Sequence, residues 1–245
     1  MKQNERNFRE IDEPFGEHVA RVRSRWFNLI ELWEVHKHLK SPKRGRMLDI
    51  GCADGRFLEY VHSRSRQCTL FGIDYAKNPL KKCLAKRIKI SVACADVCDI
   101  PFKSGLFSAG VSIQVVQHVP LKEERIRALQ GCYRVLEEGA KLVVTVVNQS
   151  TWFHAVDNRK EGQLKSCPEI FIHLFDQKDL REELESAGFN VERIIGINNL
   201  PTWCYNKLGF LAVILDVFIS ECVRPLGLKK GSYLLAECTR RACKT

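Results

Sequence analysis

Three aspartates accompany the first three short apolar runs of the chain. Asp49 lies near the end of the first run, Asp74 follows the second, and Asp96 follows the third. If these runs are neighbouring parallel strands, the three carboxylates meet at one edge of a sheet, where α/β folds bind ligands. A carboxylate at the position of Asp74 can accept both hydroxyls of a ribose, and one at Asp96 can accept the exocyclic amine of a base. The spacing therefore predicts a ligand with a nucleoside part.

The segment between the first run and the next helix-like stretch is rich in small residues. Gly51, Ala53 and Gly55 allow a tight turn in which backbone N–H groups approach a ligand. Asp49 and Asp54 would repel a pyrophosphate, and the Lys-Ser/Thr pair of a P-loop does not follow. The loop favours a ligand with a positive or neutral centre over a nucleotide polyphosphate.

The elements that must position these groups follow an alternating pattern. From Arg46 onward, short apolar runs alternate with amphipathic stretches, which is typical of a parallel sheet with crossover helices. This pattern predicts a doubly wound α/β fold over a single domain of residues 1–245, in which two late strands add a hairpin at the sheet edge. Strands are expected at 47–50, 70–73, 88–94, 109–113, 142–147, 191–197 and 232–238, and helices at 57–62, 79–86, 123–136 and 177–187.

Three segments lie outside this alternation. Residues 1–16 are mostly polar and are expected to be frayed. Residues 17–40 carry the three-to-four spacing of an amphipathic N-terminal helix, with Trp26 and Trp33 on its apolar stripe. Residues 149–175 follow the carboxyl end of a strand, so we expect them to form a substrate lid.

Composition and charge narrow the class of protein. The chain has 245 residues, of which 45% are hydrophobic, so it can bury a sizeable core. Its 11 cysteines lack both the spacing of a zinc site and the context of a secreted protein. We therefore expect no metal, a reducing cytoplasm as the location, and most of the cysteines buried as small apolar residues. The net charge of +10 is spread over several outer segments and gives only weak support for an anionic partner such as RNA or a membrane surface.

At the loop and the three aspartates, the chain resembles the class I S-adenosylmethionine-dependent methyltransferases, within the group that includes quinone, lipid and other small-molecule methyltransferases. The resemblance covers residues 45–150. It implies a Rossmann-like, seven-stranded sheet with an antiparallel last strand and S-adenosyl-L-methionine as cofactor. The family's first loop reads acid-x-Gly-x-Gly-x-Gly, and here Ala53 replaces a glycine, which is tolerable if its φ is negative and costly otherwise.

The resemblance also implies roles for particular residues. The first loop would support the methionine part of the cofactor, Asp74 would bind the ribose hydroxyls and Asp96 the adenine amine. Val97 would contact the adenine ring through its amide, and Ile113 with Gln114 would form the far wall. The implied cofactor-binding residues are Asp49, Gly51, Cys52, Ala53, Gly55, Asp74, Tyr75, Asp96, Val97, Ile113 and Gln114.

Methyl transfer from a sulfonium is an in-line displacement, which needs alignment and exclusion of water rather than a protein nucleophile. If the acceptor is a phenol or hydroxyl, a general base helps, and His118 lies near the end of the fourth expected strand. The alternative is that His118 only packs or caps in the loop before Pro120.

Three functions are compatible with these residues. The first is methyl transfer to a small-molecule acceptor that is hydrophobic or lipid-like, because the apolar, aromatic stretch 200–228 could line a pocket or touch a membrane. That stretch could equally be a core helix, and its most apolar part, 208–223, is shorter than the ~20 residues of a membrane span. The second is methyl transfer to tRNA, since residues 112–149 also resemble the wobble-uridine methyltransferases. The third is a cofactor-binding adaptor without turnover.

Overall fold

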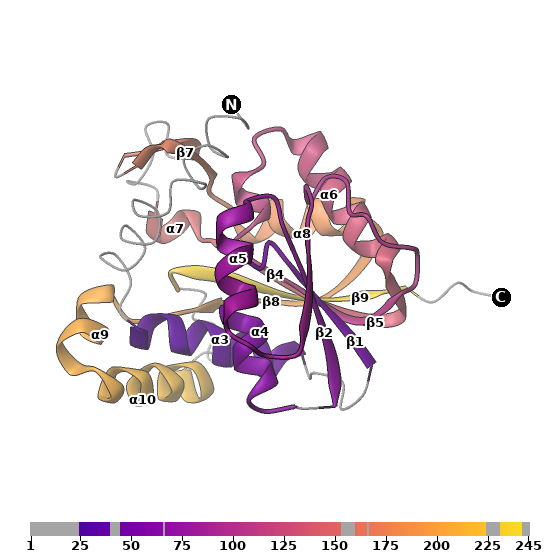
Figure 1. Cartoon of the computed structure of the whole chain (residues 1–245). Helices are drawn as coiled ribbons and strands as arrows, with labels where there is room; N and C mark the ends of the chain where they lie inside the picture. The colour runs from indigo at the N-terminus through magenta and orange to yellow at the C-terminus, as the bar shows by residue number, and fades with distance from the viewer. Residues whose placement is uncertain are drawn as a thin grey trace.

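A seven-stranded sheet forms the centre of the computed structural model, which describes residues 25–39, 45–65, 67–152, 160–165, 167–223 and 231–241 (Figure 1). Its strands are β1 (Gly45–Ile50), β2 (Cys68–Asp74), β3 (Ile90–Cys94), β4 (Phe107–Ile113), β5 (Leu136–Val147), β8 (Phe189–Ile197) and β9 (Tyr233–Arg240). Their order is β3-β2-β1-β4-β5-β9-β8, and β9 runs antiparallel to both of its neighbours. The predicted doubly wound sheet, its late hairpin and its antiparallel last strand are confirmed.

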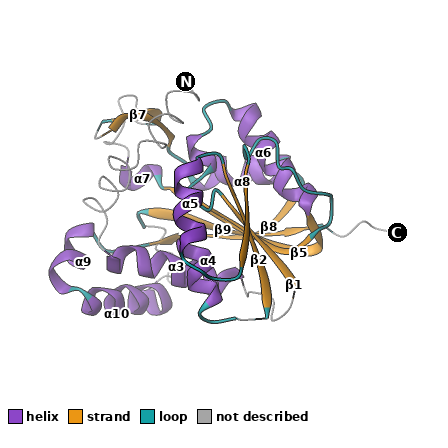
Figure 2. Ribbon diagram, viewed as in Figure 1, coloured by secondary structure: helices purple, strands orange, loops and turns teal. Residues whose placement is uncertain are grey.

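Helices cover both faces of this sheet, which gives three layers (Figure 2). One core lies under α3 (Arg25–Leu39), α4 (Arg56–His62) and α5 (Lys77–Ala85), and the other lies under α6 (Lys122–Val135) and α8 (Gln177–Ser186). Side chains alternate between the two faces along a strand, so Met47 packs in the first core and its neighbour Leu48 in the second. This alternation explains why the central strands are apolar on both sides.

The N-terminal helix α3 buries two faces rather than one. Trp26 lies on the predicted stripe, and its ring centroid is 5.7 Å from that of Phe210 in α10 (Phe210–Phe218). On another face, Phe27 lies 5.6 Å from the ring of Tyr233 in β9, and Glu31 is buried. The predicted apolar stripe therefore describes only part of the buried surface of α3. α10 packs on the stripe at Trp26, and the sheet packs on a second face that includes Phe27. Residues 17–24 and 40 of the predicted helix lie outside the described residues.

The apolar stretch after β8 folds into two short helices, α9 (Thr202–Leu208) and α10, followed by the π-helical turn η2 (Ile219–Val223). Figure 1 shows α9 and α10 beside α3, on the opposite side of the molecule from α6. Tyr205 is fully buried, whereas the outer sides of both helices are exposed, so the core-helix interpretation is wrong for that side. Within the described ranges, no helix combines the length and apolarity needed to cross a membrane.

The segment expected to form a lid contains a small hairpin that the sequence analysis did not predict. It includes α7 (Gln149–Trp152), β6 (Glu161–Leu164) and β7 (Cys167–His173), and β6 pairs with β7 in a separate two-stranded sheet. β7 packs against η1 (Val116–His118), the turn that follows β4. Residues 153–159 and 166, like the expected frayed end at 1–16, lie outside the described residues, and a lid function stays a prediction.

Candidate cofactor site

The loop after β1 is fastened to the neighbouring strand by backbone hydrogen bonds. The N–H groups of Gly51 and Cys52 both donate to the carbonyl oxygen of Ile73, at 2.7 and 2.9 Å. Gly55 then begins α4 with a φ of +77°. These bonds to β2 set the shape of the loop.

Both glycines of this loop are required by their surroundings. A Cβ on Gly51 would lie 2.3 Å from Cγ2 of Val115, and one on Gly55 would lie 2.3 Å from Sγ of Cys83, while both residues have a positive φ. Ala53 also has a positive φ, +46°. The condition under which alanine would be tolerable here is therefore not met, and Ala53 carries backbone strain that a glycine would avoid.

Asp74 connects three loops at the end of β2. Its carboxylate accepts hydrogen bonds from the backbone N–H of Ala53 at 3.0 Å and of Ala76 at 2.9 Å. Its own carbonyl oxygen accepts a bond from the N–H of Ala95 at 3.0 Å, which holds the end of β3 beside it. This buried carboxylate therefore lies where the loop after β1, the loop after β2 and the end of β3 meet.

Asp49 is buried in the strand that leads into the loop. Its burial, together with the nearby Cys83 and Asp74, raises its pKa from 3.8 to about 8. A buried carboxyl group of this kind gains from a cation, because a positive charge close by favours the ionised form. The sulfonium and ammonium groups of S-adenosylmethionine are such cations, so the chemistry of Asp49 fits this cofactor.

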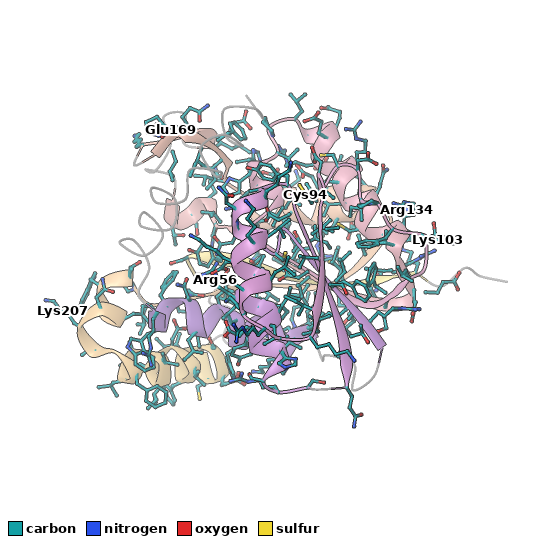
Figure 3. The ribbon with its side chains drawn as sticks, viewed as in Figure 1. Arg56, Cys94, Lys103, Arg134, Glu169 and Lys207 are labelled. Carbon is teal, nitrogen blue, oxygen red and sulfur yellow. The ribbon has the colours of Figure 1, made fainter. Side chains whose placement is uncertain are left out.

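The end of β3 supplies the third carboxylate. Asp96 is exposed, and its Oδ1 accepts the N–H of Cys98 at 2.9 Å, which shapes the turn that presents Val97. Tyr75 is half-buried in the neighbouring loop, where its carbonyl oxygen lies 3.4 Å from the thiol of Cys94. Figure 3 labels Cys94 at the end of β3 and Arg56 at the start of α4. In the described part of the chain, no group of three or more His, Cys, Asp or Glu side chains is placed to hold a metal ion.

Gln114 contacts a residue that the sequence analysis missed. It has a φ of +58°, its N–H donates to the carbonyl of Thr145 at 2.9 Å, and its amide donates to Glu31 at 2.5 Å. Glu31 also accepts the hydroxyl of Thr145 at 3.3 Å and is buried in α3. This carboxylate ties α3 to the ends of β4 and β5. The available signal was a glutamate inside the apolar run Leu29-Ile30-Glu31-Leu32.

His118 lies at the end of η1, between the sheet and the hairpin. Its Nδ1 is 2.8 Å from the carbonyl oxygen of Phe171 in β7, and a carbonyl only accepts, so Nδ1 carries the proton. Nε2 is then the acceptor nitrogen of the neutral ring, with the amide nitrogen of Gln117 at 3.5 Å. This tautomer suits a general base, although the same hydrogen bond also gives His118 a structural role, and the catalytic role stays a prediction.

Comparison with known proteins identifies a methyltransferase domain in this chain. A family model described as a methyltransferase domain matches residues 48–144. The tRNA (carboxymethyluridine(34)-5-O)-methyltransferase of Xenopus tropicalis is 32% identical over 105 residues, which are 43% of this chain and 16% of that protein. An uncharacterized protein of Methanocaldococcus jannaschii is 30% identical over 206 residues, which cover 82% of this chain and 81% of that protein.

The fold also matches a solved structure. An S-adenosylmethionine-dependent methyltransferase from Thermotoga maritima superimposes with a TM-score of 0.64 at 17% identity, covering 95% of this chain and 97% of that one. The chain spans 16% to 24% of the length of the first tRNA methyltransferase relatives. The strand order, the loop after β1 and the matched domain together place this chain in the class I S-adenosylmethionine-dependent methyltransferase family.

Proposed function

We propose that this protein transfers the methyl group of S-adenosylmethionine to an acceptor held at the carboxyl edge of its sheet. The observation that carries the proposal is the meeting of Asp49, Asp74 and Asp96 at the ends of three adjacent parallel strands. Bound S-adenosylmethionine supplies an activated methyl group on a sulfonium. Asp49 would offset its positive charge, Asp74 would accept the ribose hydroxyls and Asp96 the adenine amine.

The remaining site residues would orient and shield the reacting groups. Gln114, held by Glu31, would form the wall beside the methionine part, with Ile113 next to it. His118 would accept the proton of a hydroxyl acceptor at Nε2, because Phe171 fixes the proton on Nδ1. Most of the rate enhancement would come from alignment and exclusion of water, as expected for an in-line displacement.

We infer that the acceptor is a small hydrophobic or lipid-like molecule. α9 begins five residues after the end of β8. Ile197, the last residue of β8, and Val147, the last residue of β5, both pair with Tyr233 of β9, so these two strands end at the same edge of the sheet. The exposed apolar surface of α9 and α10 therefore starts at the same sheet edge as the cofactor residues. This position supports an apolar acceptor over a charged one.

A tRNA acceptor is the second candidate. The similarity to the tRNA methyltransferase of Xenopus tropicalis and the net charge of +10 support it. One measurement distinguishes the two candidates: the protein is incubated with cell extract and radiolabelled S-adenosylmethionine. The label should appear in the organic phase if the acceptor is lipid-like and in purified RNA if the acceptor is tRNA. Cofactor binding without label in any fraction would favour the non-catalytic adaptor.

Calorimetry with S-adenosylmethionine tests the common premise. Asp74→Asn should weaken binding about 10- to 100-fold, because it removes a charged acceptor from the ribose hydroxyls. Glu138→Ala is a matched control, since it removes an exposed carboxylate near the amino end of β5. No binding by the wild-type protein, or equal binding by Asp74→Asn and wild type when both melt normally, would refute the proposal.

A further inference from the structure

Seven large apolar side chains lie exposed on the outer sides of α9 and α10. Among the described residues, only Leu84 and Leu121 are large apolar side chains of similar exposure, and those two lie elsewhere. Isolated exposed apolar residues are ordinary, but a group on adjacent helices marks an interaction site. The seven, here called the apolar face, are 41% to 59% exposed: Trp203, Leu208, Phe210, Leu211, Ile214, Leu215 and Phe218.

Cationic side chains stacked on tryptophans border the apolar face. Trp26 belongs to this border because its ring lies 5.7 Å from that of Phe210. Figure 3 shows Lys207 at the outer edge of α9. Tryptophan beside lysine or arginine is typical of segments at a membrane–water interface, where the ring and the alkyl stem are apolar and the charge is hydrated. The three pairs are Lys207 over Trp203 at 5.8 Å, Arg25 over Trp26 at 4.8 Å and Lys37 over Trp33 at 4.9 Å.

In the described part of the chain, the acidic residues of this region are buried or paired. Asp216 is the one acidic residue of α9 and α10, and it is fully buried. Its carboxylate accepts bonds from the hydroxyl of Tyr205 and from Asn199, so it holds the helix pair together from inside. The nearest acidic residue along the chain, Glu221 of η2, is paired with Lys37. The exposed charge next to the apolar face is therefore mainly positive.

We propose that the apolar face docks on an anionic lipid membrane. Its aromatic and aliphatic side chains would enter the interfacial region while Lys207 and Arg25 contact lipid phosphates, which is how amphipathic helices lie on a bilayer without crossing it. Together with the proposed function, on which this step rests, docking would bring a lipid-like acceptor to the sheet edge where α9 begins.

Vesicle cosedimentation of the full chain tests this docking. Wild-type protein should pellet with vesicles of phosphatidylcholine and phosphatidylglycerol at about 0.1 M salt, and less with phosphatidylcholine alone. Replacing three exposed side chains (Leu211→Ser, Ile214→Ser and Phe218→Ser) should lower the partition coefficient about 100-fold. Lys207→Glu should lower it about 10-fold on the anionic vesicles. The matched control, Leu84→Ser with Leu121→Ser, should bind like wild type.

Three results would overturn the docking proposal. The first is that the wild-type protein does not cosediment with vesicles, and the second is that the wild type and the triple variant cosediment equally. The third is that the wild type is a dimer and the triple variant a monomer, while neither binds vesicles. Melting curves and S-adenosylmethionine titration of the same samples show that each variant is folded. Vesicle binding without cofactor binding would refute the proposed function and support the docking surface. Cofactor binding without vesicle binding would refute the docking surface and leave the proposed function standing.

Discussion

The backbone N–H of Ala53 donates a hydrogen bond to Oδ2 of Asp74 across 3.0 Å. This bond holds the loop after β1 against the end of β2 and directs the loop's backbone toward the carboxylate expected to bind the ribose. Ala53 has a φ of +46° in this arrangement, a value that L-residues adopt at a cost. The loop is therefore held against β2 at the expense of local strain at Ala53.

Ala53→Gly should stabilise the protein. The left-handed conformation costs an alanine about 1–2 kcal/mol of folding free energy, and glycine avoids this cost. Glycine's greater freedom in the unfolded chain offsets about 0.5–1 kcal/mol of that gain. The net gain of about 0.5–1 kcal/mol should raise the melting temperature by roughly 2–3 °C for a chain of this size. Ala140→Gly, in β5 at a buried position without a positive φ, should lower it. A lower melting temperature for Ala53→Gly would show that the loop is not strained.

Asp49 should make both stability and cofactor affinity depend on pH. The pKa of the Asp49 carboxyl group is about 8 in the folded protein and 3.8 for an ordinary, unburied aspartate, so between these values the folded protein holds a proton that the unfolded chain has lost. Stability of the ligand-free protein should therefore fall as pH rises from about 4 to 8. Affinity for cationic S-adenosylmethionine should rise over the same window, because binding requires the ionised carboxylate.

Calorimetry at pH 6, 7 and 8 checks this dependence. Wild type should bind S-adenosylmethionine up to about tenfold more tightly per pH unit. Asp49→Asn should bind weakly with little slope, and its ligand-free form should melt higher than wild type near neutral pH. Asp96→Asn, in which a different cofactor carboxylate is removed, should keep the slope. A wild-type affinity that is flat across this range would contradict the role given to Asp49.

His118→Asn separates a general base from a structural hydrogen bond. The asparagine amide can still donate to the carbonyl of Phe171, but it cannot take a proton from the acceptor. Label transfer should fall about 100-fold while affinity for S-adenosylmethionine and melting temperature stay near wild type. If His118→Asn transfers label normally and only His118→Ala loses activity, His118 has a structural role alone.

The buried ion pair between α6 and α8 should be sensitive to loss of one partner. Arg125 and Glu183 are almost fully buried and lie 2.7 Å apart, and Arg125 also donates to the carbonyls of Val119 and Pro120. Glu183→Gln should cost about 3–5 kcal/mol in urea unfolding, because it leaves a buried charge unpaired. Replacing both partners, by Arg125→Met with Glu183→Leu, should recover most of that loss.

An exposed pair between the same helices provides the control. Lys122 and Glu182 also lie 2.7 Å apart, but each is about half exposed to solvent. Lys122→Met should therefore cost less than about 1 kcal/mol. Equal losses for the buried and the exposed pair would contradict the importance of burial.

Local patterns predicted most of the sheet and the cofactor loop. Alternation of short apolar runs with amphipathic stretches placed β1, β2, β4 and β5, because strand and helix periodicity depend on neighbouring residues along the chain. The places of Asp49, Asp74 and Asp96 at the ends of neighbouring strands were predicted in the same way, since parallel strands bring their carboxyl ends to one edge, and their roles toward a cofactor stay predictions. These parts of the protein could be read from the sequence alone.

Tertiary structure decided the features that depend on which segments become neighbours. The partnership of Glu31 with Gln114 joins residues 83 positions apart, and the bond from Ala53 to Asp74 joins residues 21 positions apart. The exposure of the apolar face is set by how α10 packs on α3, because the apolar sequence alone is equally compatible with a core helix. Periodicity identifies an apolar segment, but only the packed fold shows which of its sides is covered and which faces solvent.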